Sequence, residues 1–271
     1  MPTKTGGLLP KARDDAAKEP PEAPEGSRKP QEGLKQALPA LPTEKTGGAT
    51  PLEAKTAVIY GPPGVGKSTL ASEFPGVLFF DVAGELSDIE AFKMPVSSWD
   101  EFRSSCASLT TETPRSFKVV TIDTADILGA MCSDAVLGKL GVAHESDLEW
   151  GKGWAAVRKE FLLRVAKLAA TPDLGLILIS HSKDVEIKTR SESYHRQSPS
   201  LTGGVRDACL NMADLVLFID FDEDDPEERV IYTKPSKYHE AKERGTHPRL
   251  PAQIKWPIGV SGYELLKGYW S

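Results

Sequence analysis

Residues 61–69 constrain the fold most strongly, because they match the phosphate-binding pattern G-x-x-x-x-G-K-[ST]. An apolar run at 57–60 precedes them, and a helix-compatible run at 68–74 follows. A glycine-rich turn between a strand and a helix points backbone N–H groups at phosphate. The sequence therefore predicts a nucleoside triphosphate site rather than a chance glycine-rich turn. The predicted nucleotide-binding residues are Gly61, Pro62, Pro63, Gly64, Val65, Gly66, Lys67, Ser68 and Thr69.

Three polar side chains have predicted roles at this site. Lys67 is placed to reach the β- and γ-phosphates, and the Ser68 hydroxyl to ligate Mg²⁺. Asp123 ends the apolar run 117–123, where a carboxylate that holds the Mg²⁺ hydration shell is needed. These residues predict ATP and Mg²⁺ as cofactors, with Ser68 and Asp123 as the metal-binding residues.

The first fifty residues have a composition that disfavours a folded core. Nine of the 21 prolines lie between Met1 and Pro51, and no aromatic residue does. Such a segment buries too little apolar surface to offset its ordering entropy. We therefore predict a disordered, proline-rich N-terminal tail over 1–50 and one domain over 51–271. The tail also lacks the apolar core of a secretory signal.

Charge is distributed unevenly along the chain. The net charge is −6 and the pI is near 5.5, which is not typical of a nucleic-acid binder. Seven acids lie within 220–228, whereas 234–255 holds six Lys or Arg against two Glu. A negative total can therefore coexist with a basic working face. The acidic run is read most simply as a solubilising turn.

The cysteines and the hydropathy indicate a cytoplasmic protein. Cys106, Cys132 and Cys209 are odd in number and show no C-x-x-C spacing, so reduced thiols are expected. No apolar run approaches the roughly 20 residues of a membrane span.

Strand-like and helix-like segments alternate, as a parallel α/β sheet requires. In 149–170 the apolar residues recur every three or four positions, so Trp150 and Trp154 are expected in the core. The polar segment 181–204 is too long for an ordinary connection and is expected to be a functional loop. Expected strands are 77–81, 117–123, 174–180, the hairpin 215–220 with 229–233, and 263–266; expected helices are 98–109, the stretch through 140, and 149–170.

Taken in order, several segments resemble the RecA-like ATPases of bacteriophages, a group of phage nucleotide-binding proteins that includes the short single-strand annealing recombinases. The resemblance runs from about Thr56 to Trp256. It implies an α/β fold, a RecA-like P-loop NTPase core with a mostly parallel central sheet flanked by helices. The residue after Asp123 is Thr124, whereas most AAA+ machines have the hydrolytic glutamate there. The resemblance rests on the phosphate loop and on 77–81, 119–124, 177–181, 200–204, 215–220 and 234–244.

The resemblance implies further catalytic residues besides Lys67 and Asp123. His181 lies where relatives place a polar residue that senses the γ-phosphate; the alternative is a solvated residue at a strand end. Relatives carry a water-activating glutamate two residues after the strand-ending aspartate, but this chain has Ala83 there. Either Glu85 is the catalytic base, or hydrolysis is slow and ATP acts as a binding switch.

The resemblance also implies single-stranded DNA as a partner. The segment 182–204 matches a second DNA-binding loop, with Tyr194 and His195 available to stack on bases. The alternative is a flexible surface loop. The predicted DNA-binding residues are Lys183, Lys188, Arg190, Arg196 and Arg206.

A second basic segment matches one that reaches ATP bound by the neighbouring subunit in RecA-like filaments. A cation supplied in this way would stabilise charge on the transferred phosphoryl group. The alternative is a solvated basic turn. The trans-acting candidates are Lys234, Lys237, Lys242 and Arg244.

Together these features predict an ATP-dependent, single-stranded-DNA-binding ATPase that promotes annealing or recombination, in the host cytoplasm if it is phage-encoded. A homo-oligomeric ring or filament is expected, and the tail is a candidate contact for a single-strand-binding or replication protein. Two alternatives remain open: an assembly or loader NTPase without direct DNA binding, and a nucleotide-binding scaffold with little hydrolysis.

Overall fold

The computed structural model describes residues 43, 50–111, 116–225, 227–245 and 248–270. The chain divides into two units, and the second, Gly48–Ser271, contains the helices and strands described below. The predicted disordered tail lies outside the described residues except for Thr43 and Thr50.

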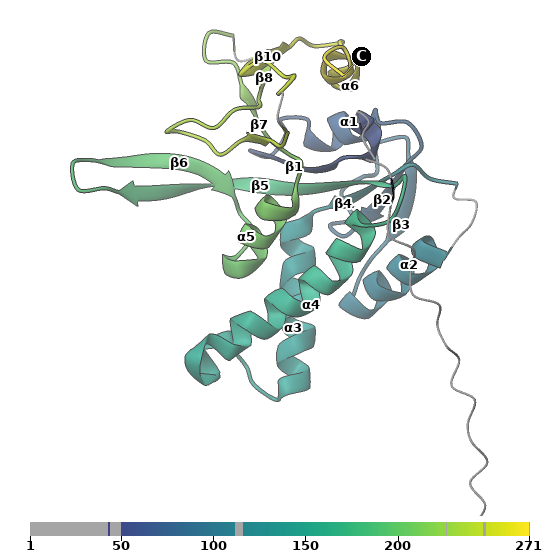
Figure 1. Cartoon of the computed structure of the whole chain (residues 1–271), viewed down its shortest axis with the longest axis vertical. Coiled ribbons are helices and arrows are strands. Elements are labelled where there is room, and N and C mark those ends of the chain that lie inside the picture. Colours follow the sequence, from purple (N-terminus) through teal and green to yellow (C-terminus); the bar gives the residue numbers. More distant parts are fainter. Residues whose placement is uncertain (1–42, 44–49, 112–115, 226, 246–247, 271) are drawn as a thin grey trace, which may run out of the picture. The chain divides into compact units, whose positions relative to one another are not determined.

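Ten strands of the described residues form one sheet, in the order β10-β8-β7-β1-β5-β4-β2-β3, with β6 paired to β5 and β9 to β7 (Figure 1). The strands from β7 to β3 in this order run parallel, and the other pairings are antiparallel. The strands are β1 (Thr56–Gly61), β2 (Val77–Asp81), β3 (Phe92–Pro95), β4 (Val119–Asp123), β5 (Gly175–Lys188), β6 (Ser193–Pro199), β7 (Leu215–Phe221), β8 (Arg229–Tyr232), β9 (Lys242–Glu243) and β10 (Gln253–Trp256).

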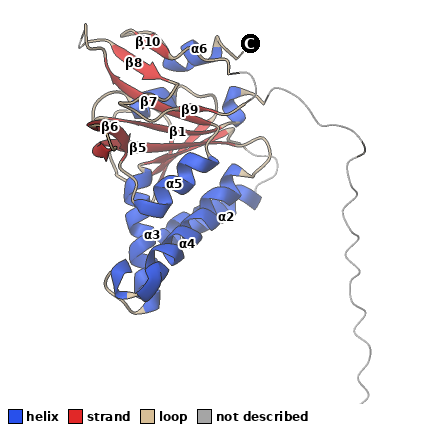
Figure 2. Cartoon of the chain, turned by 60° about the vertical axis from the view of Figure 1, so that its left-hand side comes forward, coloured by secondary structure: helices blue, strands red, loops and turns tan. Residues whose placement is uncertain are grey.

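Helices cover both faces of this sheet, because successive side chains of a strand point to opposite faces. On β1, Val58 and Tyr60 join one buried cluster and Ala57 and Ile59 join another. The first cluster includes residues of α2–α5 and the second includes residues of α1 and α6, on the opposite side in Figure 2. The helices are α1 (Lys67–Ser72), α2 (Trp99–Thr111), α3 (Ala125–Leu140), α4 (Lys152–Ala169), α5 (Gly203–Met212) and α6 (Gly262–Lys267).

This architecture confirms the predicted fold class, a RecA-like core with a mostly parallel sheet flanked by helices. The predicted strand at 77–81 has the observed bounds, and the predicted hairpin 215–220 with 229–233 is formed by β7 and β8. The strand predicted at 174–180 is the inner part of β5, between β1 and β4. All three cysteines are free and buried, in line with the expected reduced thiols.

The prediction that 181–204 is a loop is wrong. Strand β5 continues without interruption to Lys188 and pairs antiparallel with β6, from Ser182↔Pro199 to Lys188↔Ser193. We call residues 182–199 the β5–β6 ribbon; it projects beyond the rest of the sheet in Figure 1. Apart from buried Ser198 and Pro199, the ribbon has only exposed and half-buried positions and lacks a fully apolar face, so its strands carry little hydrophobic periodicity.

The two tryptophans predicted for the core are exposed. Trp150 is 90% exposed and Trp154 is 49% exposed. Helix α4 begins at Lys152, and Trp150 precedes it with φ 60°, so the helical face does not extend to this residue. Trp154 lies in the first turn of α4, which packs on the 3-10 turn Glu145–Asp147 rather than on the sheet.

The strand predicted at 263–266 is helix α6. Ser261 caps it by accepting a hydrogen bond from the Glu264 backbone N–H at 3.2 Å. The S-x-x-E spacing of Ser261 and Glu264 is a helix-start signal, and it contradicts the strand prediction. Strand β10 lies a few residues earlier and was not predicted.

Candidate nucleotide-binding site

The phosphate loop joins β1 to α1 through glycines that the geometry requires. Gly64 and Gly66 have φ of 76° and 95°, in the left-handed region that side chains with a Cβ rarely adopt. A Cβ on Gly61 would lie 2.2 Å from the Ile219 carbonyl oxygen. The glycines in 61–69 are therefore required by the backbone conformation and by the close approach of the Ile219 carbonyl, as well as by phosphate binding.

Lys67 is buried at the start of α1 and folds back on its own loop. Its Nζ donates hydrogen bonds to the Gly61 carbonyl at 3.1 Å and the Pro62 carbonyl at 2.8 Å. Burial lowers the pKa of this amine, although the charge of Asp123 nearby opposes the shift. An anion at the loop would replace weak carbonyl partners by a charge-assisted contact.

Ser68 and Asp123 meet, as the predicted Mg²⁺ site requires. The Ser68 hydroxyl donates a 2.5 Å hydrogen bond to Oδ2 of Asp123 at the end of β4. Burial raises the pKa of the Asp123 carboxyl. One carboxylate and one hydroxyl beside a phosphate cradle form the donor set that Mg²⁺ takes with a nucleotide. The residues therefore fit Mg²⁺–ATP, with the metal supplying charge neutralisation at the phosphates.

A cavity of about 230 Å³ lies beside the phosphate loop. Glu85, Thr124 and His181, all discussed in the sequence analysis, also line this cavity. It is the place where a γ-phosphate and an attacking water would meet the protein. Its lining comprises Pro63, Gly64, Gly66, Lys67, Ser68, Thr69, Glu85, Asp123, Thr124 and His181.

The turn after β2 places Glu85, not Ala83, on this cavity. Oδ1 of Asp81 accepts a 2.7 Å hydrogen bond from the Gly84 backbone N–H, and Gly84 has a positive φ of 72°. The resulting turn carries the chain past Ala83 and leaves the Glu85 side chain exposed beside the loop. Glu85 is thus within the site as a candidate base.

Asp126 is a residue that sequence reasoning missed. Its Oδ1 accepts the Ser180 hydroxyl at 2.5 Å, and its Oδ2 accepts the His181 backbone N–H at 2.9 Å. These contacts fix the point where β5 passes the cavity. The sequence gives only one indication of this role. Asp126 is an acid three residues after Asp123, in the first turn of the helix that follows.

Two buried polar atoms at the cavity have no hydrogen-bond partner among the described residues. They are Nδ1 of His181 and Oγ1 of Thr124. Buried polar atoms are normally paired, so both are available to a bound phosphate or water. Thr124 contributes a hydroxyl where an acid would follow Asp123 in an AAA+ machine, and the Asp123–Thr124 peptide bond is cis.

Replacing Asp123 with asparagine is expected to stabilise the nucleotide-free protein at neutral pH. Because burial raises this pKa, the folded state holds the proton more tightly, and stability falls as pH rises from about 3.8 through the raised value. Asp123→Asn removes that cost, so its melting temperature should rise by a few degrees while stabilisation by Mg²⁺–ATP disappears. Thermal melts with and without Mg²⁺–ATP check this; exposed Asp134→Asn is the control. A lower melting temperature would contradict it.

The predicted DNA-binding residues of the ribbon are largely paired within the chain. Lys188 lies 3.1 Å from Glu186, and His195 lies 2.9 Å from Asp184. Arg190 lies in the turn of the ribbon, exposed and without an ion pair to any described residue. Lys183 donates to the Leu201 carbonyl at 3.3 Å. Lys188 therefore has an acidic partner, whereas Lys183 and Arg190 have none among the described residues.

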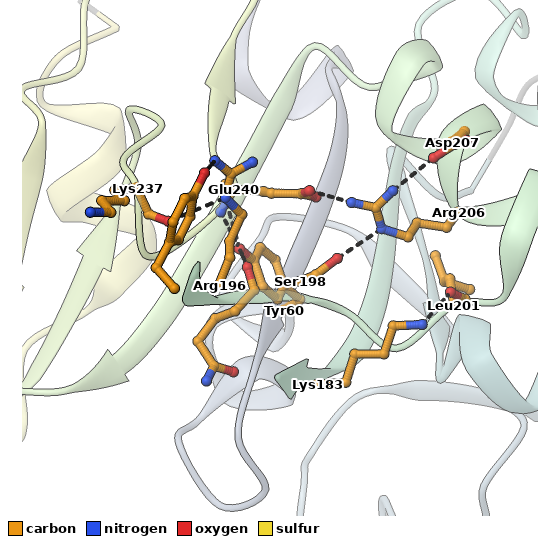
Figure 3. A network of polar contacts seen from close by, with 11 residues as sticks. Tyr60, Lys183, Arg196, Ser198, Leu201, Arg206, Asp207, Lys237 and Glu240 are labelled. Carbon is orange, nitrogen blue, oxygen red and sulfur yellow. Dashed lines mark hydrogen bonds and ion pairs between the residues drawn. The ribbon is translucent and has the colours of Figure 1, made fainter. Parts of the chain in front are cut away.

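Arg206 lies outside the ribbon, in a network at its base (Figure 3). Its guanidinium donates to Ser198 at 2.8 Å, to Asp207 at 2.7 Å, and to Glu240. The side chain is only 22% exposed. These contacts occupy the guanidinium, so Arg206 holds α5 to the base of the ribbon and to the segment containing Glu240.

Tyr194 is not free to stack on a base as expected. Arg196 and Lys237 both lie over its ring, 5.7 and 4.9 Å from the centroid. Arg196 also donates to the Tyr194 hydroxyl at 3.1 Å. His195 is the more exposed ring of the two.

The four trans-acting candidates do not line the cavity of their own chain, and each has a partner. Lys234 is 2.6 Å from Glu243, and Lys237 is 2.5 Å from Glu192. Lys242 and Arg244 donate to main-chain carbonyls at the end of α5. To reach ATP bound by a neighbouring subunit, these side chains would have to break the contacts that they make within their own chain.

The chain is similar to one family model and to two solved structures. A family model described as an AAA domain matches residues 53–245. No curated protein matches the chain. Two solved structures are similar to it at low identity: that of the RadB recombinase (TM-score 0.47, 17% identity, 78% of this chain and 90% of that chain) and that of the flagellar accessory protein FlaH from Methanocaldococcus jannaschii (TM-score 0.38, 12%, 76% and 85%). Among the described residues, no helix is long and apolar enough to cross a membrane.

Proposed function

Because the chain belongs to the AAA-domain family, whose model matches residues 53–245, we propose that this RecA-like P-loop protein hydrolyses Mg²⁺–ATP and couples nucleotide state to single-stranded DNA binding. Lys67, Ser68 and Asp123 bind Mg²⁺–ATP, and Glu85 positions the attacking water. The biological role that fits this coupling is annealing or recombination by a homo-oligomer.

The observation that carries the proposal is the continuity of β5. The strand passes the nucleotide cavity at His181 and continues as one edge of the ribbon to Lys188. Asp126 holds this strand at Ser180 and His181, so a phosphate that engages His181 acts directly on the base of the ribbon.

A second connection joins the phosphate-loop strand to the ribbon. Tyr60, the residue before Gly61, donates its hydroxyl to the Glu240 and Gln197 carbonyls at 2.6 and 3.2 Å, and accepts the Glu240 N–H at 2.9 Å (Figure 3). Two adjacent strands, β1 and β5, thus link the nucleotide to the ribbon. Through these contacts, a change in the conformation of the phosphate loop can shift the position of the ribbon.

We expect single-stranded DNA to raise the ATP turnover and to bind less tightly as salt increases, because binding through phosphates releases counterions. The double variant Lys188→Ala with Arg190→Ala should lower the magnitude of the log–log salt slope by roughly 1.4, about 0.7 for each lost contact. Fluorescence anisotropy of a labelled oligonucleotide and an ATPase assay measure both effects.

The matched control for this experiment is Lys118→Ala with Lys139→Ala, two exposed lysines outside the ribbon. Its salt slope should equal that of the wild type. Absence of DNA binding at low salt in every nucleotide state would refute the DNA role.

The internal pairing of the ribbon charges favours a second candidate function. If Lys188 and Lys237 stay bound to Glu186 and Glu192, the ribbon offers little net charge and suits a protein partner better than DNA. The chain would then be an assembly or loader NTPase. ATP turnover that responds to no nucleic acid would support that function, and no turnover at all would support a nucleotide-binding scaffold.

A further inference from the structure

An arginine–tryptophan pair lies against the phosphate loop on the side away from the Mg²⁺ residues. Arg229 opens β8 and pairs in register with Trp256, which ends β10. The guanidinium carbon of Arg229 lies 3.7 Å from the Trp256 ring centroid. Trp256 is fully buried and donates its indole N–H to the Val260 carbonyl at 2.8 Å, so the platform is rigid.

This pair contacts Gly66, the third glycine of the phosphate loop. A Cβ on Gly66 would lie 2.6 Å from Nη1 of Arg229 and 3.2 Å from the Trp256 ring. The φ of 95° at Gly66 brings the loop backbone against the guanidinium. The guanidinium is thus a direct neighbour of the loop, although Arg229 lies far beyond the end of the sequence pattern at Ser68.

The Arg229 guanidinium has no hydrogen bond or ion pair with any described residue. It is partly buried, and desolvation lowers its pKa, with the charge of Glu73 opposing the shift. Guanidinium groups at partly desolvated sites normally have an anion or a carbonyl as partner. One face lies on Trp256, and its N–H donors are unused within the described chain.

The sheet order shows which part of a nucleotide this cation would meet. Asp123 ends β4, His181 lies within β5 and Glu85 follows β2. These strands are on one side of β1 and mark the Mg²⁺ and γ-phosphate end. Strand β8 lies on the other side, beyond β7, and Arg229 pairs with Phe221 at the carboxyl end of β7. Ligands of open α/β sheets bind outside the carboxyl ends of the strands, so both groups face the same edge.

We propose that Arg229, stacked on Trp256, contacts the base of the bound nucleotide. This rests on the proposed binding of ATP and extends the site to a residue well beyond the loop pattern. A guanidinium stacked on an indole has one free face on which a purine ring can stack.

The test compares ATP with inorganic tripolyphosphate, which has the phosphates without the nucleoside. Replacing Arg229 with alanine should weaken ATP and ADP binding about tenfold and leave tripolyphosphate binding unchanged. Isothermal titration in the presence of Mg²⁺ measures all three. Arg229→Gln keeps the stem and serves the same comparison if Arg229→Ala does not fold, and exposed Arg158→Ala is the matched control.

Two results would overturn the proposal. Unchanged ATP affinity in the Arg229 variants would remove the contact. Equal weakening of ATP and tripolyphosphate would mean that Arg229 only supports the phosphate loop at Gly66. Wild-type protein that binds neither ligand would instead refute ATP binding itself, which separates this failure from that of the Arg229 contact.

Discussion

Replacing Lys67 with methionine is expected to abolish ATP turnover and weaken Mg²⁺–ATP binding by about 10²–10³-fold, the usual cost of losing a charged donor at a phosphoryl-transfer site. Methionine keeps the apolar stem of this buried side chain and removes only the ammonium group. That group is positioned by the Gly61 and Pro62 carbonyls within the loop. Titration calorimetry and a coupled ATPase assay measure the two losses.

The nucleotide-free Lys67→Met protein should remain folded. Burial lowers the pKa of Lys67, so the folded state binds this proton less tightly than the unfolded state does. Its contribution to stability is therefore larger at high pH, and removing the charge at neutral pH costs little. Exposed Lys139→Met is the matched control and should keep full activity. A Lys67→Met protein that binds Mg²⁺–ATP as tightly as wild type would exclude the proposed site.

Replacing Glu85 with glutamine is expected to lower the turnover number by about 10²–10⁴-fold while ATP affinity stays close to wild type. A glutamine keeps the size of the side chain and removes the basic carboxylate. The structural reason is that Glu85 lines the cavity, whereas Asp81 accepts the Gly84 N–H and shapes the turn. Single-turnover hydrolysis with separately measured ATP binding distinguishes a chemical defect from a binding defect.

Exposed Glu90, in the same loop but outside the cavity lining, provides the matched control as Glu90→Gln. Turnover that survives in Glu85→Gln would remove Glu85 from the mechanism. Slow turnover in both the wild type and Glu85→Gln would mean that ATP acts mainly as a binding switch. The Arg229 comparison with tripolyphosphate would be unaffected, since it depends on binding alone.

The parts of the fold that follow from local patterns were predicted well. The strand Val77–Asp81 and the hairpin of β7 and β8 are short apolar runs with clear ends. The predictions were wrong where contacts between distant segments determine the structure. Trp150 and Trp154 continue an apolar helical pattern, yet they lie beyond the part of α4 that packs on the sheet. The ribbon has no apolar face, so its hydrogen-bonded pairing left no periodic signal.

The phosphate loop and Asp123 could be read from the sequence because their chemistry requires particular residue types at short or ordered spacing. The sequence could not show which Lys and Arg side chains are free to bind a ligand. Arg206 meets Glu240 34 positions away, and Lys237 meets Glu192 45 positions away, so counts of Lys and Arg overstate the free charge. Only the folded chain brings Asp126 to His181 and the Arg229–Trp256 pair to Gly66. Local backbone chemistry determines that a triphosphate can bind; the packing of distant strands determines which side chains surround it.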